Sequence, residues 1–539
     1  MTTSLDVPAV LPPGTSAATL AEALTRFAAV VGEAHVRRAE AAGDYTDPYA
    51  FGDGVGSVPG GVVRPGSVEE VQAVVRVAAE RSVPLWTVSR GRNLAYGGAS
   101  PRVPGSVVLD LSRMNRVLEV DEEAGYARVE PGVSFADLHA HLRTLGSSLW
   151  MSVPELSWGS VLGNALERGF GYTVGGDHSA HMCGLEVVLA DGSLLRTGMG
   201  AMAGNRAWSL YKGGFGPSLD GLFLQSNYGV VTSMGIWLHP APETALMMSV
   251  AVPGFDDLGP LVDTLRPFLL DGTIRSTASI GSVLALASAI TERQQWYDGP
   301  GAMPEPVVAK LQAVFGVGRW NGRVGLYGNE EVVAAQAKLV RRACERIPGA
   351  EVGVRSYPGS PTDDLHPADR TLLGVPSTDM VRMAGWAGGD PAHIDFSLVC
   401  PPNGADALAQ MRLIRRRVNE YGFDHVGGLT LFGRHAVTLA LLSFDRADPE
   451  RRASVQEVFP RLVADAAAQG YAPYRAHVAF MDLIAEQYGW GDHAARRLQQ
   501  RIKDAVDPIG ILSPGKQGIW PSRHPDRTAE VGEQPLHRP

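Results

Sequence analysis

Residues 85–98 combine glycines and charged side chains that could surround an anionic group. The apolar run Leu85–Val88 stops at Ser89, and the ten residues that follow hold three glycines, two arginines, an asparagine and one tyrosine. Because glycine has no Cβ, successive backbone N–H groups can turn toward one point, and Arg90 and Arg92 add positive charge. The pattern indicates a loop that holds an anion such as a pyrophosphate, but these residues alone fit a solvated turn equally well.

Residues 158–172 form a second glycine-bearing stretch, which could lay its backbone against a flat ring system. The alternative for this stretch is a tight packing of a helix against a loop. No Gly-x-Gly-x-x-Gly follows a strand, and the sequence has neither a Walker loop nor a Gly-x-Ser-x-Gly elbow. A nicotinamide Rossmann site is therefore unsupported, and the two glycine stretches are left as the candidate cofactor contacts.

Two histidine pairs, His139 with His141 and His178 with His181, raise the question of a metal site. Neither pair has a third ligand at a recognisable spacing in the sequence. We therefore expect no metal.

A βαβ-like unit leads into the first glycine stretch. A strand at 62–64 is followed by Ser67 and Glu70, which predict a capping box at the start of a helix, and Pro84 begins the strand that runs into the loop. Further elements are expected downstream: strands at 106–111 and 126–130, a helix at 134–143, and a hairpin of 185–189 with 194–197.

Length and composition bound the number of domains. At 539 residues the chain is too long for one ordinary core, which predicts two or three domains. After Trp237 prolines interrupt the chain, and strands then alternate with longer helices as far as Gly470. We expect residues 241–470 to form a domain inserted between two segments of the first. These segments are 16–240 and 471–520, and the ends, 1–15 and 521–539, are expected to be disordered.

Charge and hydropathy exclude several classes of partner. The net charge of −9 argues against non-specific nucleic-acid binding, and no basic stripe with interleaved aromatics overrides it. The uncharged stretch 276–291 is shorter than the roughly 20 residues of a membrane span, so we expect a buried element there. The N-terminus has no basic region followed by an apolar one, so we do not expect secretion through such a signal. Three widely spaced cysteines favour a reducing cytoplasm.

Four stretches keep a common order along the chain: 89–102, 163–173, 226–232 and 507–516. They read Ser-Arg-Gly-Arg-Asn-Leu-Ala-Tyr-Gly-Gly-Ala-Ser-Pro-Arg, Gly-Asn followed by Arg-Gly-Phe-Gly-Tyr-Thr, Ser-Asn-Tyr-Gly-Val-Val-Thr, and Asp-Pro-Ile-Gly-Ile-Leu-Ser-Pro-Gly-Lys. Together they resemble the 4-phenol oxidizing branch of the vanillyl-alcohol oxidase flavoprotein family, which includes oxidases of vanillyl alcohol and eugenol. The resemblance runs from about residue 20 to about residue 520.

The resemblance implies an α+β fold, in which a two-segment FAD-binding domain of the vanillyl-alcohol oxidase type carries an α/β cap domain with an antiparallel sheet. The cap would cover the isoalloxazine ring and form the substrate cavity. Members of this branch often tether the flavin through a cap histidine, so an 8α-histidyl bond is expected at His393. Without the resemblance, a lone histidine in an alternating strand is more often a hydrogen-bonded core residue.

The resemblance also implies a set of FAD contacts in both segments and in the cap. They are Ser89, Arg90, Gly91, Arg92, Asn93, Leu94, Gly97, Pro154, Gly159, Ser160, Gly163, Asn164, Gly169, Gly171, Tyr172, Gly229, Val230, His393, Arg475 and Lys516.

Three residues carry over as the phenol-binding group: Tyr96, Tyr474 and Arg475. A phenol has an ordinary pKa of about 10, and a guanidinium with two hydroxyl donors favours the phenolate. The resemblance then implies hydride transfer from the benzylic carbon to flavin N5 through a p-quinone methide, and reoxidation by O2 to hydrogen peroxide. Glu155 lies where close relatives have an aspartate near N5. Its extra methylene is expected to change how an attacking water is activated.

The substrate pocket is expected to include five further positions: Gly175, Asp395, Gly428, Val437 and Thr438. Relatives have a tyrosine at the position of Gly175 and two histidines at those of Val437 and Thr438. The loss of bulk and polarity predicts a wider pocket, which would accept larger para-substituted phenols such as syringyl or other lignin-derived compounds.

The leading interpretation is an FAD-dependent oxidase of para-alkylphenols or benzylic alcohols. One alternative is a cytochrome-coupled 4-alkylphenol dehydrogenase, although relatives of that kind link the flavin through a tyrosine where this chain has His393. Another alternative is a non-catalytic flavin-binding protein, which the joint presence of Tyr96, Tyr474 and Arg475 disfavours. The expected partners are a small phenol and O2, without nucleic acid or membrane, and the resemblance implies a homodimer.

Overall fold

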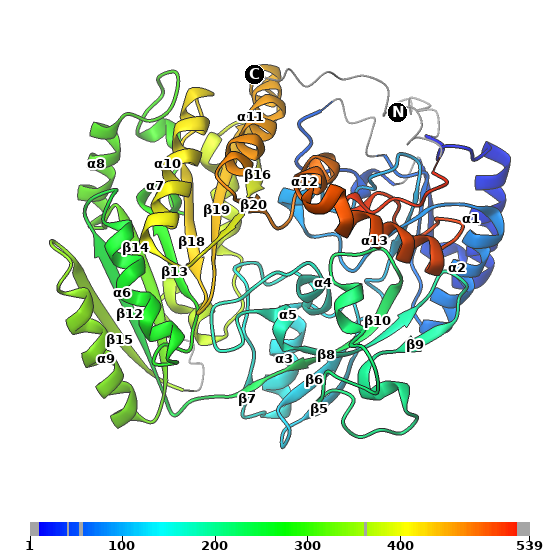
Figure 1. The fold of residues 1–539 in the computed structure, drawn as a ribbon, viewed down its shortest axis with the longest axis horizontal. Helices are drawn as coiled ribbons and strands as arrows, with labels where there is room; N and C mark the ends of the chain where they lie inside the picture. Colours follow the sequence, from blue (N-terminus) through cyan, green and yellow to red (C-terminus); the bar gives the residue numbers. More distant parts are fainter. Residues whose placement is uncertain (1–9, 40–41, 53–57, 360–363, 525–539) are drawn as a thin grey trace.

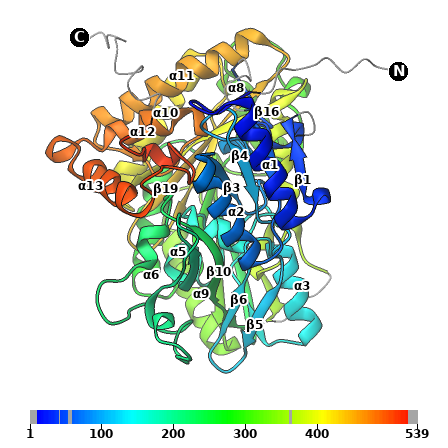
Figure 2. The same ribbon diagram turned by 90° about the vertical axis from the view of Figure 1, so that its right-hand side faces the viewer.

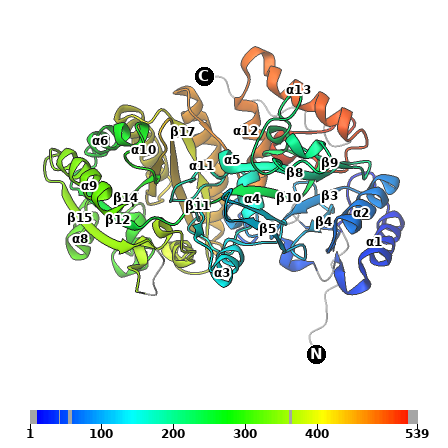
Figure 3. The same ribbon diagram turned by 90° about the horizontal axis from the view of Figure 1, so that it is seen from below.

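The structure is a computed structural model that describes residues 10–39, 42–52, 58–359 and 364–524. Figures 1 and 3 show two bodies side by side, the first built from the N-terminal half and the second from the segment that begins at β12 (Thr244–Val252). The chain then returns to the first body with α12 (Met481–Gln487) and α13 (Trp490–Val506). This arrangement of mixed helices and sheets confirms the predicted fold class.

The first sheet of the first body contains the predicted βαβ-like unit. Its strands run in the order β1 (Val36–Arg38), β2 (Gly61–Val63), β4 (Val107–Asp110) and β3 (Leu85–Val88). Strands β2 and β3 both pair with β4 in parallel. Helices α1 (Ala17–Val31) and α2 (Val68–Arg81) pack on this sheet, as Figure 2 shows.

The sequence of α2 explains both its start and its buried face. Val71, Val74, Val75 and Ala78 are fully buried, as the spacing i, i+3, i+4, i+7 predicts. The Ser67 hydroxyl accepts a hydrogen bond from the Glu70 N–H, but the Glu70 carboxylate accepts from Gly66 instead of Ser67. The expected capping box is therefore only half correct.

A second, antiparallel sheet completes the first body. It runs β5 (Val117–Asp121), β6 (Tyr126–Val129), β10 (Val230–Trp237), β8 (Met182–Val188), β9 (Leu194–Arg196). The elements around it are α3 (Phe135–Leu145), α4 (Val161–Leu166), α5 (His178–His181), and the pair β7 (Leu149–Trp150) with β11 (His239–Pro240). The predicted hairpin is confirmed, because β8 and β9 pair across the turn at Gly192, whose φ is +76°.

The second body is built on one large sheet whose strand pairs are all antiparallel. Besides β12, its strands are β13 (Ala278–Ser282), β14 (Trp320–Gly328), β15 (Glu351–Pro358), β16 (Pro391–Phe396), β17 (Leu398–Cys400), β18 (Val426–Leu431), β19 (Ala436–Asp445) and β20 (Ala472–Pro473). Its helices are α6 (Leu258–Leu270), α7 (Val283–Ser288), α8 (Glu305–Phe315), α9 (Glu330–Cys344), α10 (Gly404–Glu420) and α11 (Pro449–Ala468). We call this body the cap.

The two faces of the cap sheet have different neighbours because side chains alternate along each strand. In β14, Trp320 and Val324 belong to the core that α6, α9 and α10 cover. The intervening Asn321 and Arg323 instead line a cavity on the other face. The cap sheet therefore presents one apolar face to its helices and one functional face to the first body.

Several predictions about the remaining chain can be compared with the structure. The expected disordered ends lie largely outside the described residues, but Leu11 within them packs against the first core. The uncharged stretch 276–291 contains β13 and α7, whose buried residues make it an internal element as predicted. Within the described residues, no helix is both long and apolar enough to cross a membrane.

Candidate flavin and phenol site

A cavity of about 490 Å³ is lined by residues of both bodies. The first body contributes side chains from the stretches 86–96, 154–172, 226–231 and 512–517. The cap contributes side chains from 279–286, 321–323, 380–383, 393–395, 427–430 and 439–441.

Most residues singled out from the sequence lie in the wall of this cavity. Those that line it are Ser89, Arg90, Gly91, Arg92, Asn93, Leu94, Tyr96, Pro154, Glu155, Gly159, Ser160, Gly163, Asn164, Gly169, Tyr172, Gly229, His393, Asp395, Gly428, Arg475 and Lys516. Those that do not are Gly97, Gly171, Gly175, Val230, Val437, Thr438 and Tyr474.

The first glycine stretch is a tight loop at the end of β3. Gly91, Gly97 and Gly98 all have positive φ, at +62°, +100° and +60°. A Cβ on Gly97 would lie 2.6 Å from Val478, so this glycine is required for the loop to pack against that side chain. Arg90 donates to the Gly132 carbonyl at 2.7 Å and lies 3.3 Å from Asp137. The carboxylate of Asp137, in the first turn of α3, therefore partly neutralises the charge of Arg90.

The second glycine stretch brings α4 against the first loop. A Cβ on Gly163 would lie 2.4 Å from the Ser89 hydroxyl, so glycine is what lets these two segments meet. Ser160 caps α4 by accepting from the Gly163 N–H at 2.9 Å. Gly171 also has a packing role, because a Cβ there would lie 2.4 Å from the Ser152 hydroxyl.

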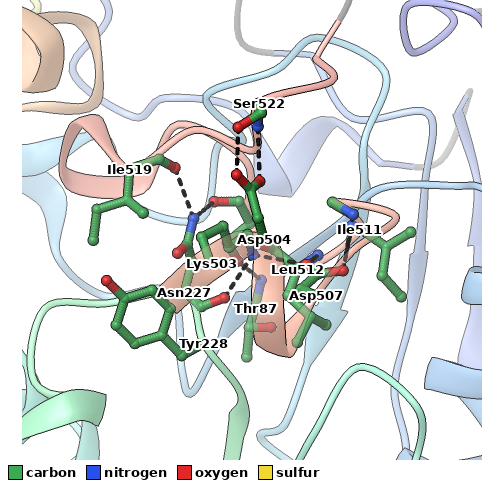
Figure 4. Close-up of polar contacts among 12 residues, drawn as sticks. Thr87, Asn227, Tyr228, Lys503, Asp504, Asp507, Ile511, Leu512, Ile519 and Ser522 are labelled. Atoms are coloured by element: carbon green, nitrogen blue, oxygen red, sulfur yellow. Dashed lines mark hydrogen bonds and ion pairs between the residues drawn. The ribbon is translucent and has the colours of Figure 1, made fainter. Parts of the chain in front are cut away.

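A buried lysine fixes the C-terminal segment beneath the first loop (Figure 4). Lys503 is fully buried, and its ammonium donates to the Asp507 carboxylate and to the carbonyls of Asn227 and Leu512, each at 2.7 Å. The Asn227 amide in turn donates to the carbonyls of Ser513 and Ile519. Since Asn227, Leu512 and Ser513 line the cavity, this cluster positions part of its wall.

The same segment is joined to β3 by backbone hydrogen bonds. The Leu85 N–H donates to the Ile511 carbonyl, and the Ser513 N–H donates to the Leu85 carbonyl, both at 2.7 Å. The two distant segments of the first body therefore form one cradle.

This cradle fits a large planar cofactor with polar groups. Trp158 Nε1, Asn227 Oδ1 and His393 Nδ1 are buried in the cavity wall and have no hydrogen-bond partner within the described part of the chain. Buried polar atoms of native proteins almost always find a partner. An FAD spanning the loop, α4 and the cap sheet would supply groups for these atoms to bind.

At one place in the cavity wall an arginine lies beside two tyrosines. The Arg475 guanidinium carbon lies 4.4 Å from the ring centre of Tyr96 and 5.3 Å from that of Tyr474. The Tyr96 hydroxyl is 3.3 Å from that of Ser397, and the buried Tyr474 hydroxyl has no hydrogen-bond partner among the residues described. The sequence motif thus assembles in space, although Tyr474 contacts the site through Arg475.

Burial controls the protonation of this group. Burial raises the pKa of Tyr96 and of Tyr474, and the nearby Arg475 only partly offsets it. Burial by itself lowers the pKa of Arg475, but the neighbouring Tyr474, Tyr96 and Asp395 leave it above its usual range. At neutral pH the group is one cation with two neutral hydroxyls, which suits a bound phenolate.

A second polar group lies along the cavity from the first. Arg323 of β14 lies 3.3 Å from the Glu155 carboxylate and also donates to the Ala368 carbonyl. Burial raises the pKa of Glu155, while Arg323 lowers it in part. Tyr172 also lines the cavity, and burial together with the charge of Glu155 raises its pKa.

His393 lies on β16 at the cap side of the cavity. Its Nε2 atom is 3.5 Å from Asp395, and its ring lies 5.1 Å from that of Tyr49. Burial lowers the pKa of His393, and Asp395 offsets this only in part. The imidazole is therefore neutral at neutral pH, the form in which a ring nitrogen can act as a nucleophile.

The structure contradicts the expected widening of the pocket at three positions. Gly175 has a φ of +81°, and a Cβ on it would point at His239, 2.8 Å away, instead of into the cavity. Thr438 faces away from the cavity, and its hydroxyl bonds the backbone of Leu398. Val437 lies on the cavity face of β19 but beyond the cavity wall.

Val230 is also a structural residue, because it is buried in the first core at the start of β10.

The described residues contain no group of three or more histidines, cysteines or carboxylates that could hold a metal ion.

Comparison with known proteins identifies the fold and the family. Residues 59–198 match the FAD binding domain model, and residues 323–517 match the model of the C-terminal domain of FAD linked oxidases. The 4-cresol dehydrogenase [hydroxylating] flavoprotein subunit of Pseudomonas putida is 35% identical over 95% of this chain and 98% of its own. The chain belongs to the vanillyl-alcohol oxidase family of FAD-linked oxidases.

Two other members show how varied this family is. The structure of 4-ethylphenol oxidase from Gulosibacter chungangensis, in an isoeugenol complex, superposes with a TM-score of 0.90 at 37% identity, covering 95% of this chain and 99% of that one. The 1'-carboxy-chondrochloren decarboxylase of Chondromyces crocatus is 32% identical over 93% of this chain and 98% of its own. Membership of the vanillyl-alcohol oxidase family therefore establishes an FAD-linked oxidoreductase scaffold, and the reaction must be argued from the site.

Sequence reasoning missed several cavity residues of the cap. Arg323, Met380 and Met383 line the cavity but belong to none of the sequence motifs. The alternation Trp-Asn-Gly-Arg-Val along 320–324 could have grouped Asn321 with Arg323 on one strand face. Nothing in the sequence indicates which face meets the cofactor.

Proposed function

We propose that this protein oxidizes para-substituted phenols with FAD as cofactor and O2 as electron acceptor. The observation that carries the proposal is the buried group of Arg475, Tyr96 and Tyr474 at one end of a cavity with an FAD-binding wall. A guanidinium and two neutral hydroxyls provide donors for a phenol oxygen and favour its ionised form. A non-catalytic flavin-binding protein would have no need for this group, whose buried Arg475 Nε and Tyr474 hydroxyl lack partners among the described residues.

The chain's own residues account for the substrate side of the reaction. Arg475 holds the phenol as phenolate, and the charge on oxygen pushes electrons through the ring toward the para carbon. The benzylic carbon then loses a hydride and the substrate becomes a p-quinone methide. When bound, FAD would accept that hydride at N5 and pass two electrons to O2 to give hydrogen peroxide.

Glu155 would act on the water that adds to the quinone methide. Its carboxylate lines the cavity and is held by Arg323 at 3.3 Å. As a carboxylate it can accept a proton from water as the oxygen attacks the benzylic carbon. Where the benzylic carbon already bears a hydroxyl, loss of the hydride gives a carbonyl product and no water is needed.

His393 would carry the flavin covalently through its 8α carbon. Two observations support this role: the imidazole is neutral, and its buried Nδ1 atom has no partner among the described residues. A histidine at this position also favours the oxidase over a cytochrome-coupled dehydrogenase, by the resemblance to relatives that use a tyrosine link. The residues proposed as FAD contacts are those of the cavity wall named above.

We also propose domain limits at 240 and 470, a cytoplasmic location and a homodimeric state. The location is supported by three buried free cysteines, Cys183, Cys344 and Cys400. The homodimer rests on the family resemblance alone, and sedimentation velocity of the purified protein tests it.

The deciding experiment measures product, acceptor and cofactor together. Purified protein is given 4-ethylphenol, vanillyl alcohol and a 3,5-dimethoxylated analogue in air, and hydrogen peroxide is compared with phenol consumed. We expect equal amounts of the two, and a yellow pellet after acid precipitation. Turnover only with an added cytochrome or artificial acceptor would replace the oxidase by a dehydrogenase, and a colourless protein without turnover would refute the proposal.

A further inference from the structure

The cap sheet carries a band of four residues along the cavity wall, with glycine at its two central positions. Leu439 of β19, Gly428 of β18, Gly281 of β13 and Asn321 of β14 are direct cross-strand neighbours. All four line the cavity. Three interstrand steps of about 4.8 Å make the band roughly 14 Å long. The two central positions have no side chain, so the floor of the cavity is lowest there.

The space above Gly281 is open. A Cβ built on this glycine would find nothing nearer than Ala285 at 3.9 Å and Leu286 at 4.0 Å. By contrast, a Cβ on Gly428 would lie 2.2 Å from the Ile280 carbonyl, so that glycine is required by the sheet itself. Gly281 is therefore a strand position where a side chain would fit the backbone but would occupy the cavity.

The walls around this space are apolar. Ala285 and Leu286 come from α7, and Met380 and Met383 come from the 3₁₀ segment Asp379–Ala387. We call the space bounded by Gly281, Ala285, Leu286, Met380 and Met383 the side lobe. Methionine side chains adapt to ligands of different shape, and aliphatic walls favour ligands without charge.

We propose that the side lobe receives the para substituent of the substrate and selects for apolar substituents longer than ethyl, including a second aromatic ring. This inference rests on the proposed binding of the phenol oxygen at Arg475, because the para substituent lies on the opposite side of the ring and extends away from that contact. The wide pocket that the sequence attributes to Gly175, Val437 and Thr438 is attributed here to Gly281. The selecting feature is the absent side chain at Gly281.

The test compares short and long ligands in two matched variants. Gly281→Leu fills the side lobe from an extended strand position, whereas Gly221→Leu adds the same side chain at an exposed position with nothing within 4 Å. Binding is measured calorimetrically on flavin-loaded protein with phenol and with 4-hydroxybenzophenone, whose carbonyl leaves no benzylic hydrogen to remove. We expect Gly281→Leu to weaken 4-hydroxybenzophenone binding at least tenfold and phenol binding less than twofold, and Gly221→Leu to change neither.

Turnover gives an independent reading of the same contact. With 4-ethylphenol and 4-pentylphenol, Gly281→Leu should raise KM for the longer substrate at least tenfold and leave the shorter one nearly unchanged. Gly281→Ala should give a smaller change in the same direction, which guards against a misfolded leucine variant. Equal losses for long and short ligands, or none, would overturn the side-lobe inference. If no phenol is oxidized but the calorimetric difference persists, the proposed oxidation fails and the side lobe stands.

Discussion

Lys503 offers a direct test of how the cofactor cradle is held together. Its ammonium is fully buried and bonds Asp507 and two backbone carbonyls, which belong to Asn227 and Leu512. The substitution Lys503→Met keeps the length of the side chain but removes the charge and all three donated bonds. Asp507 is then left as a buried carboxylate without a cation.

The size of the effect follows from what remains around Asp507. Removing one partner of a buried ion pair costs about 3–5 kcal/mol. Asp507 keeps three backbone donors, the N–H groups of Gly510, Ile511 and Leu512. We therefore expect a loss near the lower limit, about 3 kcal/mol, which is roughly a 150-fold change in the unfolding equilibrium at 1.4 kcal/mol per decade.

The free energy of unfolding is measured in urea, and unfolding of the first body is monitored by the increase in flavin fluorescence. The exposed Arg501 lies on the same helix, and Arg501→Met provides a matched control in which we expect less than about 0.5 kcal/mol of change. Adding Asp507→Asn to Lys503→Met should recover part of the loss, because the uncompensated charge is then gone. A loss below about 1 kcal/mol, or no recovery in the double variant, would refute this account of the cradle.

Three further predictions concern the reaction. Arg475→Met should lower kcat/KM for 4-ethylphenol by about a hundredfold to a thousandfold, the scale on which loss of one preorganised donor slows a reaction, while the flavin spectrum stays unchanged; retained activity would exclude its role at the phenol oxygen. Because burial raises the pKa of Glu155, hydration of the quinone methide should fall as pH decreases through that raised value. A quinone methide that is not hydrated can lose a side-chain proton and give an alkene, so the ratio of alcohol to alkene product should depend on pH. Glu155→Gln should remove this pH dependence. A ratio with the same pH profile in both proteins would count against Glu155 as the base. His393→Ala should bind flavin that acid releases into the supernatant, and a pellet that stays yellow would place the covalent bond elsewhere.

The first body could be predicted from the sequence because its signals are local. The strand Leu85–Val88 begins one residue after the predicted start at Pro84 and ends where the apolar run meets a glycine loop whose residues need positive φ. Helix α3 begins after Ser134, which makes a complete capping box with Asp137. Such signals depend on neighbours in the chain and do not require knowledge of the fold.

The cap side of the site could not be predicted in the same way. Whether Val437 or Leu439 reaches the cavity depends on where β19 lies relative to the first body, which no local pattern encodes. Gly175 looked like a missing side chain of the pocket, but its positive φ and its contact with His239 are turn requirements. Gly281 carried no motif, and its importance follows only from its cross-strand neighbours.

The positions of the three residues proposed to bind the phenol oxygen link recognition to the assembly of the two bodies. Tyr96 ends the glycine loop of the first body, whereas Tyr474 and Arg475 follow β20, where the chain leaves the cap sheet. The Tyr96 hydroxyl reaches Ser397 of the cap, and the Tyr474 N–H donates to the Ser397 carbonyl. The group of Tyr96, Tyr474 and Arg475 therefore lies at the junction of the two bodies. Under the proposed function, a phenolate would be recognised by residues that come together only where the two bodies meet, and burial there would strengthen the interaction between each pair of charges.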